Sequence, residues 1–472
     1  MISPTSLPAS QPFQSISTLR LLYGNDLNKN WDNMSRLVNG FAQVSQAGHQ
    51  HGMDVVRLDN GNSYSGRCPK GWVANVLVKN LMGLHASGIG NLDVEQGWQN
   101  FINGAGLARF PWLAGNLKAS QNSGAAPQNV TVIQGQHGPY AVIGVTNPLA
   151  KTAVGPGVSL EPISVSNLPE TIRQVQQDVN RLEGLGIKRI VVVSHMGEAA
   201  DDTLARQTAG IDVIVGTADW DRPVNQTVTS ARGEPVTIVR NFRRGNTLGV
   251  SDVRFTPQGT VADENSVRIP SGVFGRSPAA DGVLNAALGP AKPVAYLNNT
   301  IPLDWRRLNP VGLFVARTAR DLSQADVALV RATEIRDDVT PGWLTDRKLS
   351  TLLPFEEKLV MVSVSGAAIY SALQRSAQGK APLLHPAGIR YQIDAAGTPV
   401  GVTVQDRQTG RWGPLDPRRQ YRVAMTGYPV VNNMEYPEFY GAPVVWQSDL
   451  SARGMFETGV RQAGSPGRVI DL

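Results

Sequence analysis

The sequence contains a single cysteine, Cys68, in 472 residues. One cysteine excludes an internal disulfide framework, and no Cys-x-x-Cys or Cys/His spacing suggests a structural zinc site. The simplest interpretation of Cys68 is a buried or inert thiol. Long apolar runs are also missing, since no stretch approaches the roughly 20 residues that a membrane helix needs. We therefore expect neither a membrane span nor a fold held together by disulfides or zinc.

Charged residues are sparse as well. They make up 17% of the chain and give a formal net charge of +6, without any run of Lys or Arg. This distribution argues against a nucleic-acid partner and supports no more than a mild preference for anionic ligands. Residues 1–17 are rich in Ser, Pro and Gln and lack the apolar core of a signal peptide, which predicts a disordered tail. Either the protein is cytoplasmic, or this sequence begins after a removed export signal.

What the sequence does contain is the pattern of a two-domain α/β protein. With 41% hydrophobic residues, the chain is long enough for two ordinary cores. Short β-rich runs alternate with helical patterns, such as the three- and four-residue spacing of apolar residues over 168–185. This alternation predicts an α/β layer domain over 18–265. The Gly- and Pro-rich segment 266–293, with a helix near 281–288, is typical of a linker, and 294–472 is expected to form a separate α/β domain.

Five short motifs follow one another in the order and spacing of the calcineurin-like metallophosphoesterases. They are Leu-Leu-Tyr-Gly-Asn-Asp-Leu-Asn at 21–28, Arg-Leu-Asp-Asn-Gly-Asn-Ser-Tyr-Ser-Gly at 57–66, Gly-Asn-Leu-Asp at 90–93, Val-Val-Val-Ser-His-Met-Gly at 191–197 and Asp-Val-Ile-Val-Gly-Thr-Ala-Asp-Trp at 212–220. From about residue 18 onward the chain resembles the 5′-nucleotidase family. The resemblance implies a metallophosphoesterase-type α/β/β/α sandwich followed by a second α/β domain, and a periplasmic or extracellular location.

In that family, two divalent ions hold a phosphoryl group and activate a water molecule. Of the eight positions that the resemblance implies for this site, three are retained: Asp26, Asn91 and His195. The five that are changed are Asn28, Asn62, Leu92, Ala218 and Trp220. Asn62 stands where the aspartate that bridges the two ions belongs, and a neutral amide cannot offset the repulsion between adjacent dications.

We therefore expect Asp26, Asn62, Asn91 and His195 to form a vestigial or weak metal site, and we expect no metal cofactor. If the protein is active, its cofactor would be Mn, Zn or Mg. The alternative is an atypical site rebuilt from nearby carboxylates, for which the candidates are Asp59, Asp93, Asp219 and Asp221. Without such a site, His195 becomes a hydrogen-bonded histidine in a polar pocket, and Trp220 fills the space of a metal.

The second domain keeps fragments of the family's ligand site. The resemblance assigns substrate binding to Arg307, Arg336, Phe355, Arg390 and Tyr436. Two aromatic rings can hold a base between them while arginines surround the ribose and phosphate. Arg331 and Glu334 add bulk and charge where the family has a tight turn, and they could pair with each other and close the pocket. The competing interpretation makes Phe355 a core aromatic and Tyr436 part of a surface cluster.

These observations predict a 5′-nucleotidase-like pseudoenzyme that serves as a binding or structural component of the cell envelope. Its candidate partners are a nucleotide or other anionic small ligand and a cell-envelope protein. The alternative is an active metal-dependent 5′-nucleotidase or phosphodiesterase that hydrolyses nucleotides at an atypical site. A third hypothesis is a nucleotide or anion sensor that works through the second domain alone.

Overall fold

The computed structural model describes six ranges of the chain, which form two compact units. The described residues are 17–64, 69–94, 97–119, 127–147, 163–217 and 223–463. The first unit extends to Pro290 and the second begins at Ala291. Cys68 and almost all of the predicted tail lie outside the described residues, so the predictions for them stay predictions.

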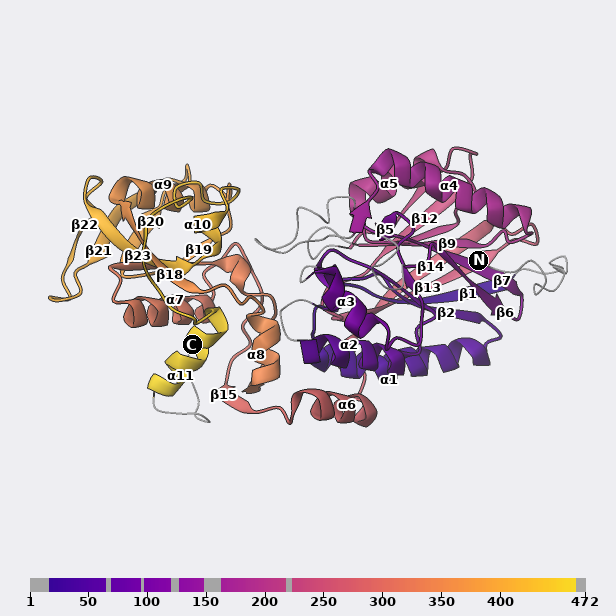
Figure 1. Ribbon diagram of the computed structural model, residues 1–472, viewed down its shortest axis with the longest axis horizontal. Helices are drawn as coiled ribbons and strands as arrows, with labels where there is room; N and C mark the ends of the chain where they lie inside the picture. Colours follow the sequence, from indigo (N-terminus) through magenta and orange to yellow (C-terminus); the bar gives the residue numbers. More distant parts are fainter. Residues whose placement is uncertain are drawn as a thin grey trace. The chain divides into compact units, whose positions relative to one another are not determined.

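Two six-stranded sheets form the centre of the first unit (Figure 1). One has the order β14-β13-β1-β2-β3-β4, with the strands Val261–Pro270, Thr247–Phe255, Ser17–Gly24, Asp54–Asp59, Ala86–Gly88 and Trp112–Leu113. The other has the order β11-β12-β10-β9-β7-β6, with the strands Gln226–Thr229, Pro235–Arg240, Val213–Gly216, Ile190–Ser194, Gly138–Val145 and Val130–Gly135. A short ribbon pairs β5 (Leu117–Ala119) with β8 (Ile163–Val165).

Helices cover the outer face of each sheet. The first sheet carries α1 (Trp31–Gln50), α2 (Pro69–Met82) and α6 (Pro278–Leu288), with α3 (Trp98–Ala105) packed against α2. The second sheet carries α4 (Leu168–Gly184) and α5 (Glu198–Gln207) (Figure 1). The predicted α/β/β/α sandwich is therefore confirmed.

Helix α4 illustrates how the sequence pattern becomes structure. Asn167 precedes the helix and its side chain accepts a hydrogen bond from the Glu170 N–H at 3.0 Å, which caps the first turn. The apolar residues that predicted this helix face the second sheet, and all of them are buried: Ile172, Val175, Val179 and Leu182. The expected range of 168–185 is confirmed to within one residue.

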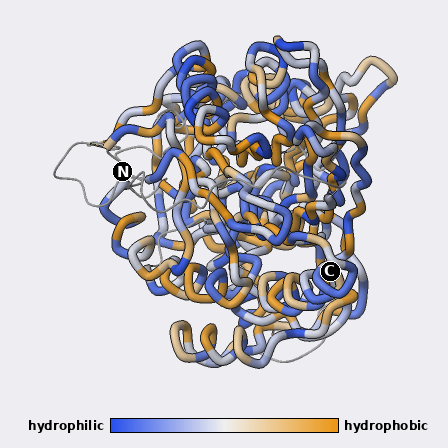
Figure 2. Tube along the Cα trace, turned by 90° about the vertical axis from the view of Figure 1, so that its right-hand side faces the viewer, coloured by the Kyte–Doolittle hydropathy of each residue, from blue (hydrophilic) through white to orange (hydrophobic). Residues whose placement is uncertain are grey.

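The two sheets face each other across a layer of apolar side chains. Leu21, Val56 and Val191 belong to this layer and are fully buried. The hydrophobic strands and the alternating hydropathy of the covering helices can be followed along the chain in Figure 2. The sheets approach each other closely at Gly144 of β7, where an added Cβ would lie 2.2 Å from the Leu113 Cβ and 2.5 Å from its backbone carbonyl carbon. Glycine is therefore required there for the backbones to approach.

The boundary of the first unit differs from the prediction of a linker over 266–293. Strand β14 continues to Pro270, and the following segment is bonded to α1: the Ser35 hydroxyl donates to Asp281 at 2.8 Å. The ring of Phe274 also sits against Gly40, where an added Cβ would lie 2.7 Å away. The segment is rich in glycine and proline, yet it packs as part of the first unit.

The second unit is a smaller α/β domain. Its main sheet has the order β19-β16-β23-β18-β24, with the strands Leu384–Ala387, Val327–Arg331, Gln420–Thr426, Leu359–Ser365 and Val444–Gln447. A second sheet joins β20 (Ile389–Ile393), β21 (Pro399–Gln405) and β22 (Trp412–Pro414), and a ribbon joins β15 (Pro293–Leu297) to β17 (Gly342–Thr345). The helices are α7 (Pro310–Ser323), α8 (Asp346–Leu352), α9 (Gly366–Ala377), α10 (Tyr428–Val431) and α11 (Ala452–Gln462). α7 and α11 pack together on one buried cluster, and α9 belongs to another.

Within the part of the chain that the structure describes, no helix combines the length and the apolar character required to cross a bilayer.

Replacing Gly144 by alanine tests the close approach of the sheets. We expect Gly144→Ala to lower the free energy of unfolding by about 3 kcal/mol, because the new Cβ collides with the backbone of Leu113. The matched control is Gly184→Ala, in the last turn of α4, where nothing lies within 4 Å of an added Cβ and the change should stay within about 1 kcal/mol. Urea unfolding followed by tryptophan fluorescence measures both, and equal stability of the two variants would contradict the packing argument.

Candidate functional site

The carboxyl ends of three parallel strands bring the predicted metal-site residues of the first unit together. β1, β2 and β3 run parallel in one sheet, so the loops that follow them meet at one edge. Asp26, Asn62 and Asn91 lie in these loops. His195 follows β9 of the other sheet, and its Nδ1 lies 2.9 Å from the backbone carbonyl of Asn60. All of the predicted residues therefore lie at neighbouring strand ends.

The side-chain amide of Asn62 is the centre of this arrangement. Its Nδ2 donates to Asp26 Oδ1 at 2.8 Å and to Asn91 Oδ1 at 3.3 Å. Its Oδ1 accepts from the Leu92 N–H at 2.7 Å. Because a backbone N–H can only donate, this last bond fixes the oxygen end of the amide and leaves its NH₂ group facing Asp26 and Asn91.

This orientation decides how well the residues suit a pair of metal ions. A ligand must direct a lone pair at the ion, but here an N–H donor occupies the side of Asp26 and Asn91 that faces Asn62. The Asn62 oxygen is already committed to Leu92. The donor set therefore does not fit two adjacent dications, and hydrogen bonds within the protein satisfy the groups that would bind them.

Arg243 supplies positive charge beside the remaining aspartate. Its Nε lies 3.7 Å from Asp26 Oδ2, and Asp26 is buried. The next residue, Arg244, donates its backbone N–H to the Asp26 carbonyl at 2.7 Å. A guanidinium offers the counter-charge that a buried carboxylate requires. Arg243 could not be predicted from the sequence, since an arginine in a loop far along the chain carries no local signal of this contact.

The loops at this edge retain unusual backbone geometry. Asp26, Asn28 and Asn62 have φ angles of 45°, 48° and 51°, which non-glycine residues rarely adopt. The Asn28 N–H donates to the Asn62 carbonyl at 3.0 Å, which holds two of these loops together. Such strain commonly persists at functional sites because the surroundings hold it in place.

His195 is buried and has a defined tautomer. Because the Asn60 carbonyl can only accept, Nδ1 must carry the proton in their 2.9 Å hydrogen bond, and Nε2 keeps its lone pair when the ring is neutral. Metal-binding histidines are oriented in the same way. His195 therefore keeps the geometry of a ligand or base, in contrast to Asn62.

Two of the carboxylates proposed as substitute ligands, Asp59 and Asp93, lie within the described residues, and both have structural roles. Asp93 accepts backbone N–H bonds from Asn62, Ser63 and Gly90 at 2.8–2.9 Å, and burial raises its pKa to about 6. Asp59 pairs with Lys79 Nζ at 2.7 Å. Within the described ranges no three His, Cys, Asp or Glu side chains are grouped to hold a metal. The other positions named for this site lie outside those ranges: Ala218, Asp219, Trp220 and Asp221.

Lys79 is a second residue of this site that was not predicted. It lies on α2 with no exposed surface, and its Nζ also contacts the hydroxyls of Ser63 and Ser87 at 2.6 and 2.8 Å. The signal in the sequence was a lysine directly after the mostly apolar run 72–78, because a charge next to such a run is buried only with a partner. The buried pair with Asp59 anchors the loop that carries Asn62.

In the second unit, Arg336 occupies the faces of two aromatic rings. Its guanidinium carbon lies 4.9 Å from the ring centroid of Trp305 and 5.0 Å from that of Phe355. Phe355 is half-buried, so its ring is not simply a core residue. Arg307 points away, with 86% of its side chain exposed and its Nε 3.5 Å from Asp304. Of the predicted ligand residues, only Arg336 and Phe355 are brought into contact.

Arg331 lies at the centre of a charged cluster close to these residues in sequence. Its guanidinium bonds to Glu334 at 2.5 Å, Glu435 at 2.9 Å and Glu357 at 3.2 Å. It also lies 4.4 Å from the ring centroid of Tyr428. The expected pairing of Arg331 with Glu334 is confirmed, and two further glutamates join it.

The placement of Tyr436 and Arg390 corrects the predicted ligand site. Tyr436 has no exposed surface, its hydroxyl donates to the Pro382 carbonyl, and its ring packs on Phe439 at 6.0 Å. The neighbouring residue Glu435 points to Arg331, whereas the side chain of Tyr436 is buried in the core. Arg390 lies on β20, where its guanidinium carbon is 3.9 Å from the ring centroid of Trp412. Neither residue contacts Phe355, and Tyr428 is the tyrosine that reaches the charged cluster.

Comparison with known proteins agrees with this architecture. Residues 292–439 match the model of the 5′-nucleotidase C-terminal domain. A 5′-nucleotidase of Bos taurus is 24% identical over 89% of this chain and 83% of its own length.

Two solved structures share the fold over nearly the whole chain. The 5′-nucleotidase precursor from Thermus thermophilus has a TM-score of 0.73 at 20% identity, covering 96% of this chain and 100% of that one. A sulfate thiohydrolase of the same organism has a TM-score of 0.70 at 18% identity, covering 99% and 98%. At this identity the structures establish the fold alone. The two proteins that share the fold are named for different activities. The C-terminal domain match and the sequence relatives support the assignment of the chain to the 5′-nucleotidase family, and the solved structures add its fold.

Proposed function

We propose that this protein is a 5′-nucleotidase-like pseudoenzyme, which binds a ligand or partner without hydrolysing phosphate esters efficiently. The orientation of the Asn62 amide carries the proposal. Its NH₂ group is directed at Asp26 and Asn91, the two oxygen ligands that the sequence retains. Enzymes of this family depend on metal ions, and a bound pair of ions supplies both the activated water and the clamp on the phosphoryl group.

The charges around the site support the same proposal. Asp26 has Arg243 beside it, and Asp59 has Lys79. A dication brought to Asp26 would have to displace the Asn62 donor and lie close to the Arg243 guanidinium, and both changes cost free energy. The protein's own side chains thus provide the positive charge that metal ions provide in an active relative.

His195 is the observation that favours an active enzyme instead. Its Nε2 lone pair is available in the neutral ring, as in a metal ligand. Under this alternative the protein is a metal-dependent nucleotidase or phosphodiesterase, with any further ligands drawn from residues beyond the described ranges, such as Asp219 or Asp221. Metal content and turnover separate the two proposals.

In the second unit, the charges argue against a nucleotide at the family's position. The cluster there combines three glutamates, Glu334, Glu357 and Glu435, with Arg331. Burial and the charge of Glu334 raise the pKa of Glu357 to about 7. These carboxylates repel a phosphate, and the guanidinium of Arg336 already covers the Phe355 ring. As partners we propose a small anionic ligand bound elsewhere and a cell-envelope protein, and as location the periplasm or the cell exterior.

Metal content and turnover give the first test of the proposal. We expect the purified protein to retain close to zero equivalents of Mn, Zn or Mg, and to release no phosphate from nucleotides above the level of its own His195→Ala variant. The measurements are elemental analysis and a sensitive phosphatase assay with each metal added. About two tightly held metal ions per chain, or turnover that His195→Ala abolishes, would establish the active alternative.

Restoring the missing carboxylate gives a sharper test. We expect Asn62→Asp to lower the free energy of unfolding by about 2–4 kcal/mol, because a second carboxylate would face Asp26 and two N–H donors would be lost. We also expect added Mn or Zn to recover part of this loss, while the melting temperature of the unmodified protein does not respond to metal. Asn180→Asp, an exposed position on α4, is the control for an added charge. A metal response in the unmodified protein would contradict the proposal.

The raised pKa of Glu357 predicts how stability depends on pH. The folded state holds this proton up to about pH 7, whereas the unfolded chain releases it near its ordinary value of about 4.5. The free energy of unfolding therefore falls by about 2–3 kcal/mol as the pH rises through this window, because the folded state must give up the proton on Glu357. We expect Glu357→Gln to gain stability over the unmodified protein across these pH values, and the exposed neighbour variant Glu356→Gln to gain none. A difference that does not change with pH would contradict this assignment.

A further inference from the structure

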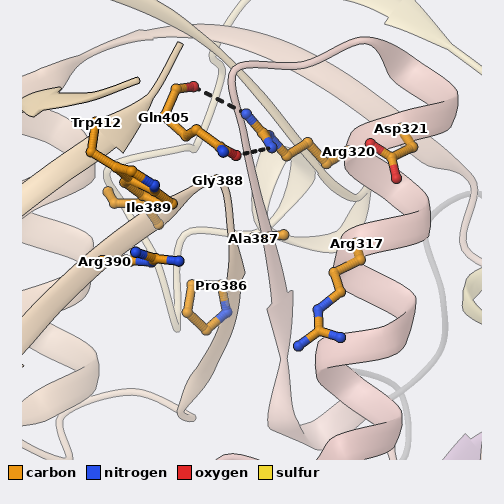
Figure 3. A pocket seen from close by; sticks show the side chains of 10 residues that line it. All are labelled: Arg317, Arg320, Asp321, Pro386, Ala387, Gly388, Ile389, Arg390, Gln405 and Trp412. Carbon is orange, nitrogen blue, oxygen red and sulfur yellow. Dashed lines mark hydrogen bonds between the residues drawn. The ribbon is translucent and has the colours of Figure 1, made fainter. Parts of the chain in front are cut away.

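The second unit has a basic pocket that lies apart from the Phe355 cluster. It is formed by α7 together with strands β19 to β22, and it has a volume of about 410 Å³ (Figure 3). Pockets for small molecules commonly fall in this range. The residues that line it are Arg317, Arg320, Asp321, Pro386, Ala387, Gly388, Ile389, Arg390, Gln405 and Trp412.

Arg320 is a fixed positive charge in the wall of this pocket. Its Nε donates to the Asp326 carbonyl, and its two terminal nitrogens donate to the side-chain and backbone oxygens of Gln405, all at 3.0 Å. Gly388, at φ 75°, allows this arrangement, since an added Cβ would lie 2.3 Å from Arg320 Nε. The guanidinium is therefore held rigidly by neutral oxygens, and the carboxylates of Asp321 and Asp326 act on its charge without a hydrogen bond to it.

Arg317 and Arg390 extend toward the same space from opposite sides. Arg317 is exposed on α7, three residues before Arg320 and thus on the same face of the helix. Arg390 comes from β20, and its guanidinium is oriented by stacking on Trp412 at 3.9 Å. In Figure 3 the guanidinium groups of Arg317 and Arg390 lie on either side of Pro386. Neither forms an ion pair or a hydrogen bond within the described part of the second unit.

The acidic groups nearby do not neutralise these arginines. Asp321 is the one carboxylate in the lining, its side chain is 64% exposed, and it lies 3.5 Å from Arg407, which is outside the pocket. Three arginines and one aspartate leave the lining with a formal charge of +2. Elsewhere in this unit, arginines such as Arg331 and Arg375 are paired with glutamates. The pocket therefore keeps the guanidinium groups of Arg317 and Arg390 available.

We propose that this pocket binds a small phosphate ester. The guanidinium groups of Arg317 and Arg390 each present planar N–H donors that match phosphate oxygens, and a dianion balances the charge of the lining. The apolar part of the ester lies against Ile389, Pro386 and the edge of Trp412. The site is independent of the metal question in the first unit, so it stands whether the protein is a pseudoenzyme or an active hydrolase.

Calorimetric titration of the full chain with phenyl phosphate tests this proposal. The buffer contains a chelator, which prevents metal-dependent turnover and separates this test from that of the hydrolase site. We expect saturable binding at about 1 mM or below, and affinities about tenfold weaker for Arg317→Gln and for Arg390→Gln. The control is Arg418→Gln, an exposed arginine of the same unit that is outside the pocket and should bind as the unmodified protein does.

Three outcomes would overturn the proposal. They are no binding of phenyl phosphate up to about 10 mM, unchanged affinity in the double variant of Arg317 and Arg390, and an equal loss in Arg418→Gln. Titration with succinate separates phosphate esters from dicarboxylates, and tighter binding of succinate would also count against a phosphate site. Because Arg317 and Arg390 are exposed, we expect all variants to unfold at the same temperature as the unmodified protein without ligand.

Discussion

The side-chain amide of Asn62 holds together the loops on which the first unit's site depends. Its three side-chain hydrogen bonds and its backbone N–H reach Asp26, Asn91, Leu92 and Asp93, so that the loops after β1, β2 and β3 share one anchor. A carboxylate at this position could not donate to Asp26, and the two would repel unless a cation lay between them. The amide therefore holds the three loops together through hydrogen bonds within the protein.

Ion pairs between the protein's own side chains recur in the molecule. Lys79 neutralises Asp59 beneath the Asn62 loop, and Arg243 lies beside Asp26. In the second unit, Arg331 is enclosed by three glutamates and Tyr428. Buried charges are tolerated only when paired, so each pair preserves a polar interior. In both units the opposite charge comes from the protein's own residues.

The fold thus persists where the chemistry of the family site has changed. Two proteins named for different activities share this two-unit architecture at about 20% identity. This fits the general rule that function resides in sites carried by a fold. The basic pocket around Arg317 and Arg390 shows where this chain leaves arginines available. Its geometry rests on a glycine and on carbonyl oxygens, which position charge without neutralising it.

The sequence by itself determined the architecture and the identity of the changed metal positions. The strands and helices of both units follow from local apolar spacing and capping, as Asn167 and the buried face of α4 show. The replacement of a carboxylate by an amide at Asn62 can also be read from one position. These features are local, so neighbouring residues specify them.

Only the tertiary structure decided which distant side chains meet. It placed Tyr436 in the core and Tyr428 beside Arg331, moved Arg390 to a separate pocket, paired Lys79 with Asp59, and joined the segment around Phe274 to the first unit. Each of these outcomes depends on contacts between residues far apart in the chain. Which distant residues come into contact depends on burial and charge pairing across the whole unit. A local sequence pattern does not contain this information.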